Sequence, residues 1–163
     1  MDQPSPKPKR ARKQPAEFKI VALRECAVPE RLHLCDTPEK AHEYFELHIK
    51  SDEKFRPECE CFITLFLNTR RRIIGHYIVS VGTLDSLLIH PREVFRAAII
   101  SASSAVVLMH NHPSGDPSPS EADIRVTRDL IRAGQILKID VLDHVIVGHD
   151  RKVSLKELGY FYT

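Results

Sequence analysis

The sequence has little glycine and cysteine, and it lacks a long apolar run. Its six glycines are scattered, and Gly115 has no glycine neighbours to form a phosphate-cradling loop, so nucleotide hydrolysis has no support. Four irregularly spaced cysteines favour reduced thiols over a disulfide framework. No apolar stretch reaches the length of a membrane span. The N-terminus also lacks the hydrophobic segment of a secretory signal, so we predict a cytoplasmic protein with no membrane partner.

The net charge of +2 hides an uneven distribution along the chain. Residues 1–19 hold six Lys or Arg and two acids, which gives +4 there and −2 for the remainder. Prolines among these charges argue against regular structure, so we predict a basic, Pro-rich, disordered tail over residues 1–20. Such a tail binds nucleic acid weakly by counterion release in some proteins and is only solvated in others, and both interpretations stay open.

Helical and extended patterns are mixed along residues 38–163, which we predict to form one domain. The mixed order predicts an α+β fold, an α-β-α sandwich around a mixed sheet. Arg70-Arg71-Arg72 lies between two strand-like runs and is predicted to form a hairpin turn. Helices are expected over 37–49, from 90 onward and from about 119 to Gly134, and strands over 62–67, 73–81, 105–112, 139–147 and 152–154.

Two histidines follow a short apolar run. Residues 105–109 are all apolar, which is typical of a strand buried on both faces. His110 and His112 would extend this strand. Because side chains two apart in a strand point the same way, both imidazoles are expected to face one point in space.

A helix start lies downstream of the histidines. Ser118, Pro119 and Glu121 are predicted to be the N-cap, the first and the third position of a capping box. Ser120 and Asp123, three residues apart, then share a face that the loop 113–117 can return over the histidines. Two histidines and one aspartate, with water in the fourth position, predict a tetrahedral, catalytic Zn²⁺ site.

Simpler interpretations of these residues exist. A lone His-x-His pair is often a surface feature, and Ser120 beside a helix N-terminus can simply satisfy backbone donors. The tripeptide His-Asn-His also spells the name of the HNH nucleases, but in those enzymes the three residues are dispersed along a ββα-metal hairpin. The conjunction of the histidines with Ser120 and Asp123 favours a metal site.

The pattern H-x-H-P, six residues, S-x-x-D, formed by His110, His112, Pro113, Ser120 and Asp123, resembles the JAMM motif of MPN+ domain metallopeptidases. The spelling His-Asn-His-Pro-Ser-Gly-Asp is similar to the bacterial RadC-like (UPF0758) family, in which Asn111 replaces the Ser or Thr of deubiquitinating relatives. The likeness spans residues 38–163 and includes segments 60–62, 81–84, 90–95, 142–144 and 153–156. It implies the JAMM/MPN (cytidine deaminase-like) fold.

The resemblance also implies a mechanism. Glu60, at the start of an early strand, would be the general base on the zinc-bound water and then the general acid toward the leaving amine, although Glu58 lies two residues away. Ser120 would donate a hydrogen bond to the tetrahedral oxyanion. Asp143 and His144 would support the ligands from outside the metal's first coordination sphere, or would be structural.

We therefore predict a zinc-dependent metallohydrolase, a metallopeptidase or isopeptidase that cleaves an amide bond. Two alternatives stay open: a DNA-associated repair or recombination accessory protein acting through the basic tail, and a non-catalytic MPN scaffold. Relatives often carry a helix-hairpin-helix region before this domain, and we expect none here. The sequence indicates neither the substrate nor the oligomeric state, and imidazole and carboxylate also suit other divalent ions.

Overall fold

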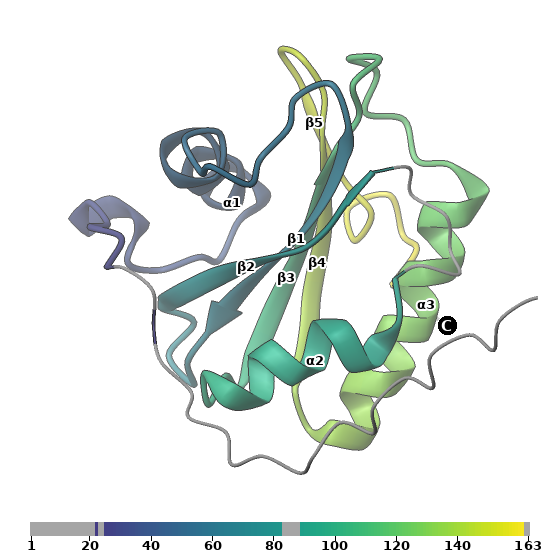
Figure 1. Ribbon diagram of the computed structural model, residues 1–163. Helices are drawn as coiled ribbons and strands as arrows, with labels where there is room; N and C mark the ends of the chain where they lie inside the picture. The colour runs from purple at the N-terminus through teal and green to yellow at the C-terminus, as the bar shows by residue number, and fades with distance from the viewer. Residues whose placement is uncertain (1–21, 23–24, 83–88, 162–163) are drawn as a thin grey trace, which may run out of the picture.

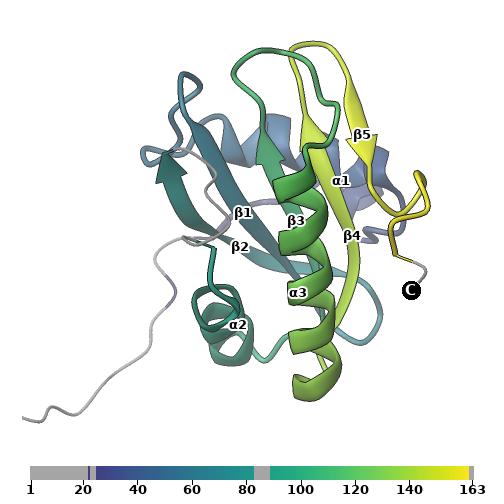
Figure 2. The same ribbon diagram turned by 90° about the vertical axis from the view of Figure 1, so that its right-hand side faces the viewer.

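A mixed five-stranded sheet lies between helices on both of its faces in the computed structural model (Figures 1 and 2). The structure describes residue 22 and residues 25–82 and 89–161, so the predicted tail over residues 1–20 lies outside the described residues. The elements are η1 (Glu30–Leu32), α1 (Pro38–Tyr44), η2 (Phe45–Ile49, a π-helical turn), β1 (Glu60–Leu67), β2 (Ile73–Gly82), α2 (Pro91–Ile100), β3 (Ala105–Asn111), α3 (Glu121–Leu137), β4 (Asp140–Val147) and β5 (Lys152–Ser154).

The strand order is β2-β1-β3-β4-β5, which places β3 at the centre of the sheet. Strand β3 pairs antiparallel with β1 and parallel with β4, and β2 and β5 add antiparallel edges. All seven residues of β3 are buried, as its apolar sequence predicts. Both the α+β class and the α-β-α sandwich are therefore confirmed.

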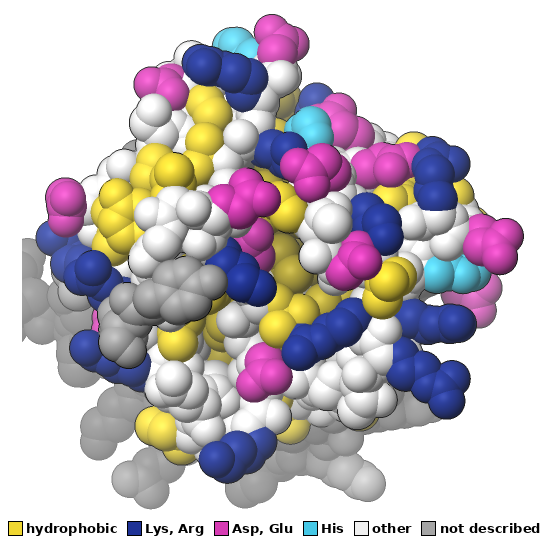
Figure 3. Space-filling model, turned by 180° about the vertical axis from the view of Figure 1, so that it is seen from behind, with side chains coloured by type: hydrophobic (Ala, Val, Ile, Leu, Met, Phe, Trp, Pro, Cys, Tyr) yellow, Lys and Arg dark blue, Asp and Glu magenta, His cyan; other side chains and the backbone are white. Residues whose placement is uncertain are grey.

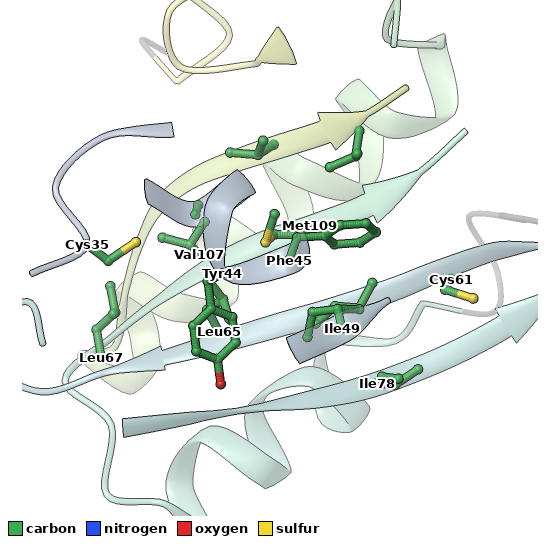
Figure 4. Packing of buried hydrophobic residues seen from close by; sticks show 14 of the residues in the cluster. Cys35, Tyr44, Phe45, Ile49, Cys61, Leu65, Leu67, Ile78, Val107 and Met109 are labelled. Atoms are coloured by element: carbon green, nitrogen blue, oxygen red, sulfur yellow. The ribbon is translucent and has the colours of Figure 1, made fainter. Parts of the chain in front are cut away.

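The helix α1 and the turn η2 cover one face of the sheet. Tyr44, Phe45 and Ile49 project from them onto Leu65 of β1 and Met109 of β3 (Figure 4). The chain before α1 joins this packing, since Cys35 belongs to the same buried cluster and Val28 packs against it. The buried apolar cluster on this face also contains Ile63, Leu67, Val107, Val145 and Val147.

Helices α2 and α3 cover the opposite face (Figure 2). Their buried side chains pack against the strand residues that alternate with those of the first face, including Val106 and Leu108 of β3. His110 continues the series of Val106 and Leu108, so its side chain lies on the α3 side of the sheet. Asn111 has the opposite orientation. The cluster on this face also contains Phe62, Phe66, Phe95, Ala98, Val126 and Leu130.

The predicted hairpin between β1 and β2 is confirmed. The side-chain oxygen of Asn68 accepts hydrogen bonds from the backbone N–H groups of Arg70, at 2.9 Å, and Arg72, at 3.1 Å. Arg71 adopts a left-handed φ of 61°. This side-chain turn lets a run of three arginines reverse the chain without a glycine.

The predicted start of α3 is wrong by two residues. Ser120, and not Ser118, is the N-cap, and the helix begins at Glu121. Ser118 does not cap the helix, because both its N–H and its hydroxyl donate to Asp116 Oδ1, at 3.1 and 2.8 Å. Pro119 therefore precedes the helix, and the capping box is made by Ser120 with Asp123.

The predicted end of α3 is also wrong. The helix continues through Gly134 to Leu137 and ends at Lys138, which has a left-handed φ of 58°. Gly134 lies inside the helix, where a Cβ atom would come within 2.5 Å of the Ile139 carbonyl oxygen. Its role is thus close packing rather than termination. Among the described residues, no helix has both the length and the apolar character that crossing a bilayer requires.

Candidate metal centre

The three side chains predicted to be metal ligands meet beyond the end of β3. His110 belongs to β3, His112 follows its last residue, and Asp123 lies in the first turn of α3. One ligand atom of each lies within 4.8 Å of those of the other two. The two Nε2 atoms are 2.9 Å apart, and His110 Nε2 is 3.2 Å from Asp123 Oδ1. His110 and Asp123 are fully buried, and His112 is half-buried.

A backbone carbonyl orients the ring of His112. The Nδ1 atom of this ring lies 2.7 Å from the carbonyl oxygen of Asp116. Because a carbonyl oxygen only accepts hydrogen bonds, Nδ1 carries the proton. In the neutral ring, the lone pair of Nε2 then faces His110 and Asp123.

A chain of three hydrogen bonds sets the tautomer of His110. The hydroxyl of Thr127 donates to the carbonyl oxygen of Asp123, at 2.5 Å, so toward His144 Nδ1, at 2.6 Å, it accepts. His144 Nε2 is therefore the acceptor for His110 Nδ1–H, at 2.8 Å. The Nε2 atom of His110 is left with its lone pair toward the site.

His144 is neutral, as this chain of hydrogen bonds requires. Its side chain is fully buried, and burial first, then the nearby His110, hold its pKa well below the usual value for histidine. Phe62 packs against both rings, stacked on His110 and edge-on to His144. The prediction that His144 supports the site from outside the ligand set agrees with this position.

The two carboxylate oxygens of Asp123 differ in their contacts. Oδ2 accepts hydrogen bonds from the N–H and the hydroxyl of Ser120, each at 2.7 Å. Oδ1 is buried and has no hydrogen-bond partner. Burial acts to raise the pKa of Asp123, but the adjoining rings of His110 and His112 and the hydrogen bonds from Ser120 outweigh it and lower the pKa, so the group is ionised.

These donors fit a divalent metal ion. Two imidazole lone pairs and one orphaned, ionised carboxylate oxygen converge, and three protein ligands of these types leave a fourth tetrahedral position open. The hydrogen bond with Asp123 raises the pKa of His112 against the effect of burial. A proton therefore competes with a metal ion for this ring.

Glu60, the predicted acid–base residue, lies near His112. It is the first residue of β1, and Phe62 pairs with His110 in the antiparallel ladder. Two residues further along this register, Glu60 comes opposite His112, on the same face of the sheet. The charge of Glu60 contributes to the raised pKa of His112, which agrees with this proximity. Glu58 lies near Glu60 at the rim of a hollow that also contains Pro113.

Ser120 acts first as a helix cap and as a partner of Asp123. Its hydroxyl donates to Asp123 Oδ2 and accepts from the backbone N–H of Asp123, at 3.2 Å. The predicted contact with an oxyanion would require this hydroxyl to leave the carboxylate. The structure thus brings Ser120 to the site, in the capping arrangement that is the simpler interpretation of its sequence position.

Residues 35–160 match the family model of the RadC-like JAB domain. The chain belongs to this family. Among similar proteins, a UPF0758 protein of Methanosarcina mazei is 41% identical over 145 residues, which are 89% of this chain and 61% of that protein. A UPF0758 protein of Caldanaerobacter subterraneus is 52% identical over 102 residues, 63% of this chain and 44% of that protein. The chain thus matches about half the length of these relatives.

Gly115 of this RadC-like JAB domain shapes the loop after His112. It has a left-handed φ of 85°, and a Cβ atom there would lie 2.5 Å from Nδ1 of His149. The N–H of His149 also donates to the Gly115 carbonyl oxygen, at 3.3 Å. This close approach fixes the loop that carries Asp116 and so helps to orient His112.

Sequence reasoning assigned no role to two further residues of the RadC-like JAB domain. Thr127 ends the hydrogen-bond chain to His110, and Asn111 bonds to the start of β1. Their partners lie 17 and 50 residues away in sequence, so no local pattern indicates them. Spacing of four from Asp123 places Thr127 on the same helix face, which was the only available signal.

A second hollow adjoins the candidate centre. Its volume is about 340 Å³, and its walls include the apolar side chains of Phe45, Phe55 and Val147. His112 and Pro113 form part of its lining. Pro113 therefore lines both this hollow and the hollow that contains Glu58 and Glu60.

Proposed function

We propose that the protein is a zinc-dependent metallohydrolase, a metallopeptidase or isopeptidase that cleaves an amide bond with a metal-activated water. One observation supports this most directly. The lone pairs of His110 and His112 and the orphaned oxygen of Asp123 converge on one point. Zinc suits this mixture of imidazole and carboxylate and is tetrahedral with three protein ligands and one water in hydrolytic sites.

Each residue of the centre has a part in the proposed reaction. Bound zinc would lower the pKa of its water to about 7 and polarise the amide carbonyl. Glu60 accepts the proton of the attacking water on its carboxylate and then delivers it to the leaving amine. His144 and Thr127 hold the ring of His110, and the Asp116 carbonyl holds that of His112.

The hydroxyl of Ser120 has a second part in this proposal. In the structure it donates a hydrogen bond to Asp123 and orients its carboxylate. On substrate binding, rotation of the hydroxyl would direct its proton to the developing oxyanion, while the Ser120 N–H keeps its bond to Asp123 Oδ2. The backbone contact lets the carboxylate stay in place when the side chain moves.

Nucleic-acid contact through residues 1–19 stays a prediction, because those residues lie outside the described part of the chain. On the face shown in Figure 3, the described Lys and Arg side chains are interspersed with Asp and Glu. Because the two signs of charge are mixed, that face gives no electrostatic reason for a polyanion to bind to it. The alternative of an accessory role in DNA repair therefore has no support from that face.

The first test is the metal content of the wild type, His112→Ala and Glu60→Gln by elemental analysis. We expect about one zinc per chain in the wild type and in Glu60→Gln, and none in His112→Ala, because His112 supplies a ligand atom and Glu60 does not. Wild-type protein without zinc after resupply would contradict the proposal.

Activity is tested next with the zinc-loaded protein on a library of fluorogenic peptide amides and branched isopeptides. We expect turnover in the wild type to fall at least about 100-fold in Glu60→Gln, the size of a general-acid–base contribution. Glu58→Gln is the matched control and should keep wild-type turnover. A loss in Glu58→Gln with activity kept in Glu60→Gln would transfer the role to Glu58.

A further inference from the structure

The side chain of Asn111 bridges two backbone positions of the segment that leads into β1. Its Oδ1 accepts a hydrogen bond from the N–H of Cys61, at 2.9 Å, and its Nδ2 donates to the carbonyl oxygen of Cys59, also at 2.9 Å. Asn111 and Cys61 are both buried. Glu60 is the residue between the two bridged positions.

These two bonds take over where the strand ladder stops. Backbone pairing between β1 and β3 ends with Phe62 opposite His110. Beyond that pair, the Asn111 amide replaces a strand partner for Cys59 and Cys61. The N–H of Cys61 and the carbonyl oxygen of Cys59 thus find their partners on the β3 side in one side chain.

Asn111 therefore connects the two ligand histidines with Glu60, although its own side chain lies on the opposite face of the sheet. Its neighbours in sequence, His110 and His112, point toward α3, whereas Asn111 points toward the α1 side and reaches the backbone on either side of Glu60. The same tripeptide thus carries two candidate ligands and the group that sets the position of Glu60 relative to them.

We propose that Asn111 is a positioning residue for Glu60, which it holds opposite His112 by bridging Cys59 and Cys61. This inference rests on the proposed hydrolytic function, because only in that function does the position of Glu60 relative to His112 matter for the reaction. A primary amide suits the task since it offers one donor and one acceptor in a fixed plane. A hydroxyl or a carboxylate does not supply the same pair from one rigid group.

The first test measures the position of Glu60 without any substrate. The protein is loaded with Co²⁺ alone, and the paramagnetic shifts of the Glu60 and Glu121 side-chain carboxyl carbons are followed by NMR. We expect Asn111→Ala to change the Glu60 shift and broaden its signal, while Glu121, on α3, keeps its shift. An unchanged Glu60 shift would overturn the proposal, whereas failure of the wild type to bind Co²⁺ would overturn the proposed metal site instead.

The isosteric variant Asn111→Asp protects this test against misfolding. Aspartate keeps an acceptor for the Cys61 N–H but presents a second acceptor to the Cys59 carbonyl oxygen, so one bond is kept and the other becomes repulsive. We expect the Cys61 amide to stay protected from hydrogen exchange and the Glu60 shift to move. An unchanged Glu60 shift in Asn111→Asp would likewise overturn the proposal.

The second test is a double-mutant cycle on hydrolysis, with the peptide amide that the wild type cleaves best. Asn111→Ala should lower kcat about 10- to 100-fold with little change in KM, as expected for a displaced acid–base group. In the Glu60→Gln background, the same substitution should lower kcat less than twofold. Equal losses in both backgrounds would show that Asn111 acts independently of Glu60 and would overturn the proposal.

Discussion

The ligand half of the candidate centre and its acid–base half are supported in different ways. His110, His112 and Asp123 each have a separate hydrogen-bond partner that fixes the orientation of the donor atom, from α3, β4 or the loop after β3. Glu60 instead lies at the start of the inner strand β1, where it pairs with Gly82 of β2 and where one amide side chain bridges its segment on the β3 side. Metal binding and turnover therefore depend on different contacts and should be separable by mutation.

The largest effect on the ligand half should come from breaking the hydrogen-bond chain behind His110. We expect His144→Ala and Thr127→Val to weaken zinc affinity about 10- to 100-fold, because the first removes the partner of His110 and the second removes the hydroxyl that sets the tautomer of that partner. Thr127→Ser keeps the hydroxyl and is the matched control, with near wild-type affinity. Affinity is measured by competition with a chromophoric chelator.

Glu60→Gln should leave zinc affinity unchanged in the same assay. A comparable loss in Glu60→Gln would contradict the separation of the two halves, and wild-type affinity in Thr127→Val would contradict the tautomer assignment. Circular dichroism of each variant establishes whether the fold is kept.

The pH dependence of zinc binding should sharpen the comparison further. The pKa of His112 is raised above the usual value for histidine by Asp123. Protonation of His112 stabilises the folded, metal-free protein. This stabilisation is present in full below the histidine pKa of the unfolded chain, about 6.5, and is lost as pH rises through the raised pKa of the folded protein. Zinc affinity should therefore fall about tenfold per pH unit on the acid side of the raised pKa.

Titrations of zinc binding between pH 5 and 8, in roughly half-unit steps, would measure this slope. Glu60→Gln should show a similar slope with its midpoint at slightly lower pH, since Glu60 contributes less to the shift than Asp123 does. An affinity independent of pH across this range would contradict the role of His112.

The smallest effect should arise in the loop that joins the two ligand elements. Gly115 and Gly159 share a φ of 85°, but only Gly115 has a neighbour, His149, where a Cβ atom would be added. Either change to alanine should lower the free energy of unfolding by about 1 kcal/mol for backbone strain. Gly115→Ala should cost about 1 kcal/mol more because His149 must move.

Chemical denaturation of the two variants gives this difference directly. The loop of Gly115 also carries the carbonyl that orients His112, so Gly115→Ala should weaken zinc binding as well, and Gly159→Ala should not. Equal stabilities and equal affinities in the two variants would mean that the contact with His149 has no consequence for the centre.

Much of the fold and the convergence of the ligand side chains could be predicted from local patterns. The apolar run before His110 specifies a central strand, and the two-residue spacing to His112 specifies one face. The helix start was predicted two residues early because Ser118 and Ser120 both fit a cap, and only the contact of Ser118 with Asp116 distinguishes them.

Other features depend on distant pairings that no local pattern contains. The position of Glu60 was predicted from a family resemblance, whereas the bridge that holds its segment spans 50 residues and could not be read from sequence. His144 is 34 residues from His110, and it reaches the ligand only because β3 and β4 pair in parallel with Leu108 opposite His144. Strand register is a tertiary property, so these contacts required the structure.

The capping box at the start of α3 gives Asp123 two separate tasks. Its Oδ2 accepts the capping hydrogen bond from the N–H of Ser120, and its Oδ1 faces the histidines. The helix start, the strand and the ring orientations therefore form from contacts that do not use the metal-facing atoms. The zinc of the proposed centre would thus be acquired late, by a scaffold already assembled, and its removal would leave the fold in place.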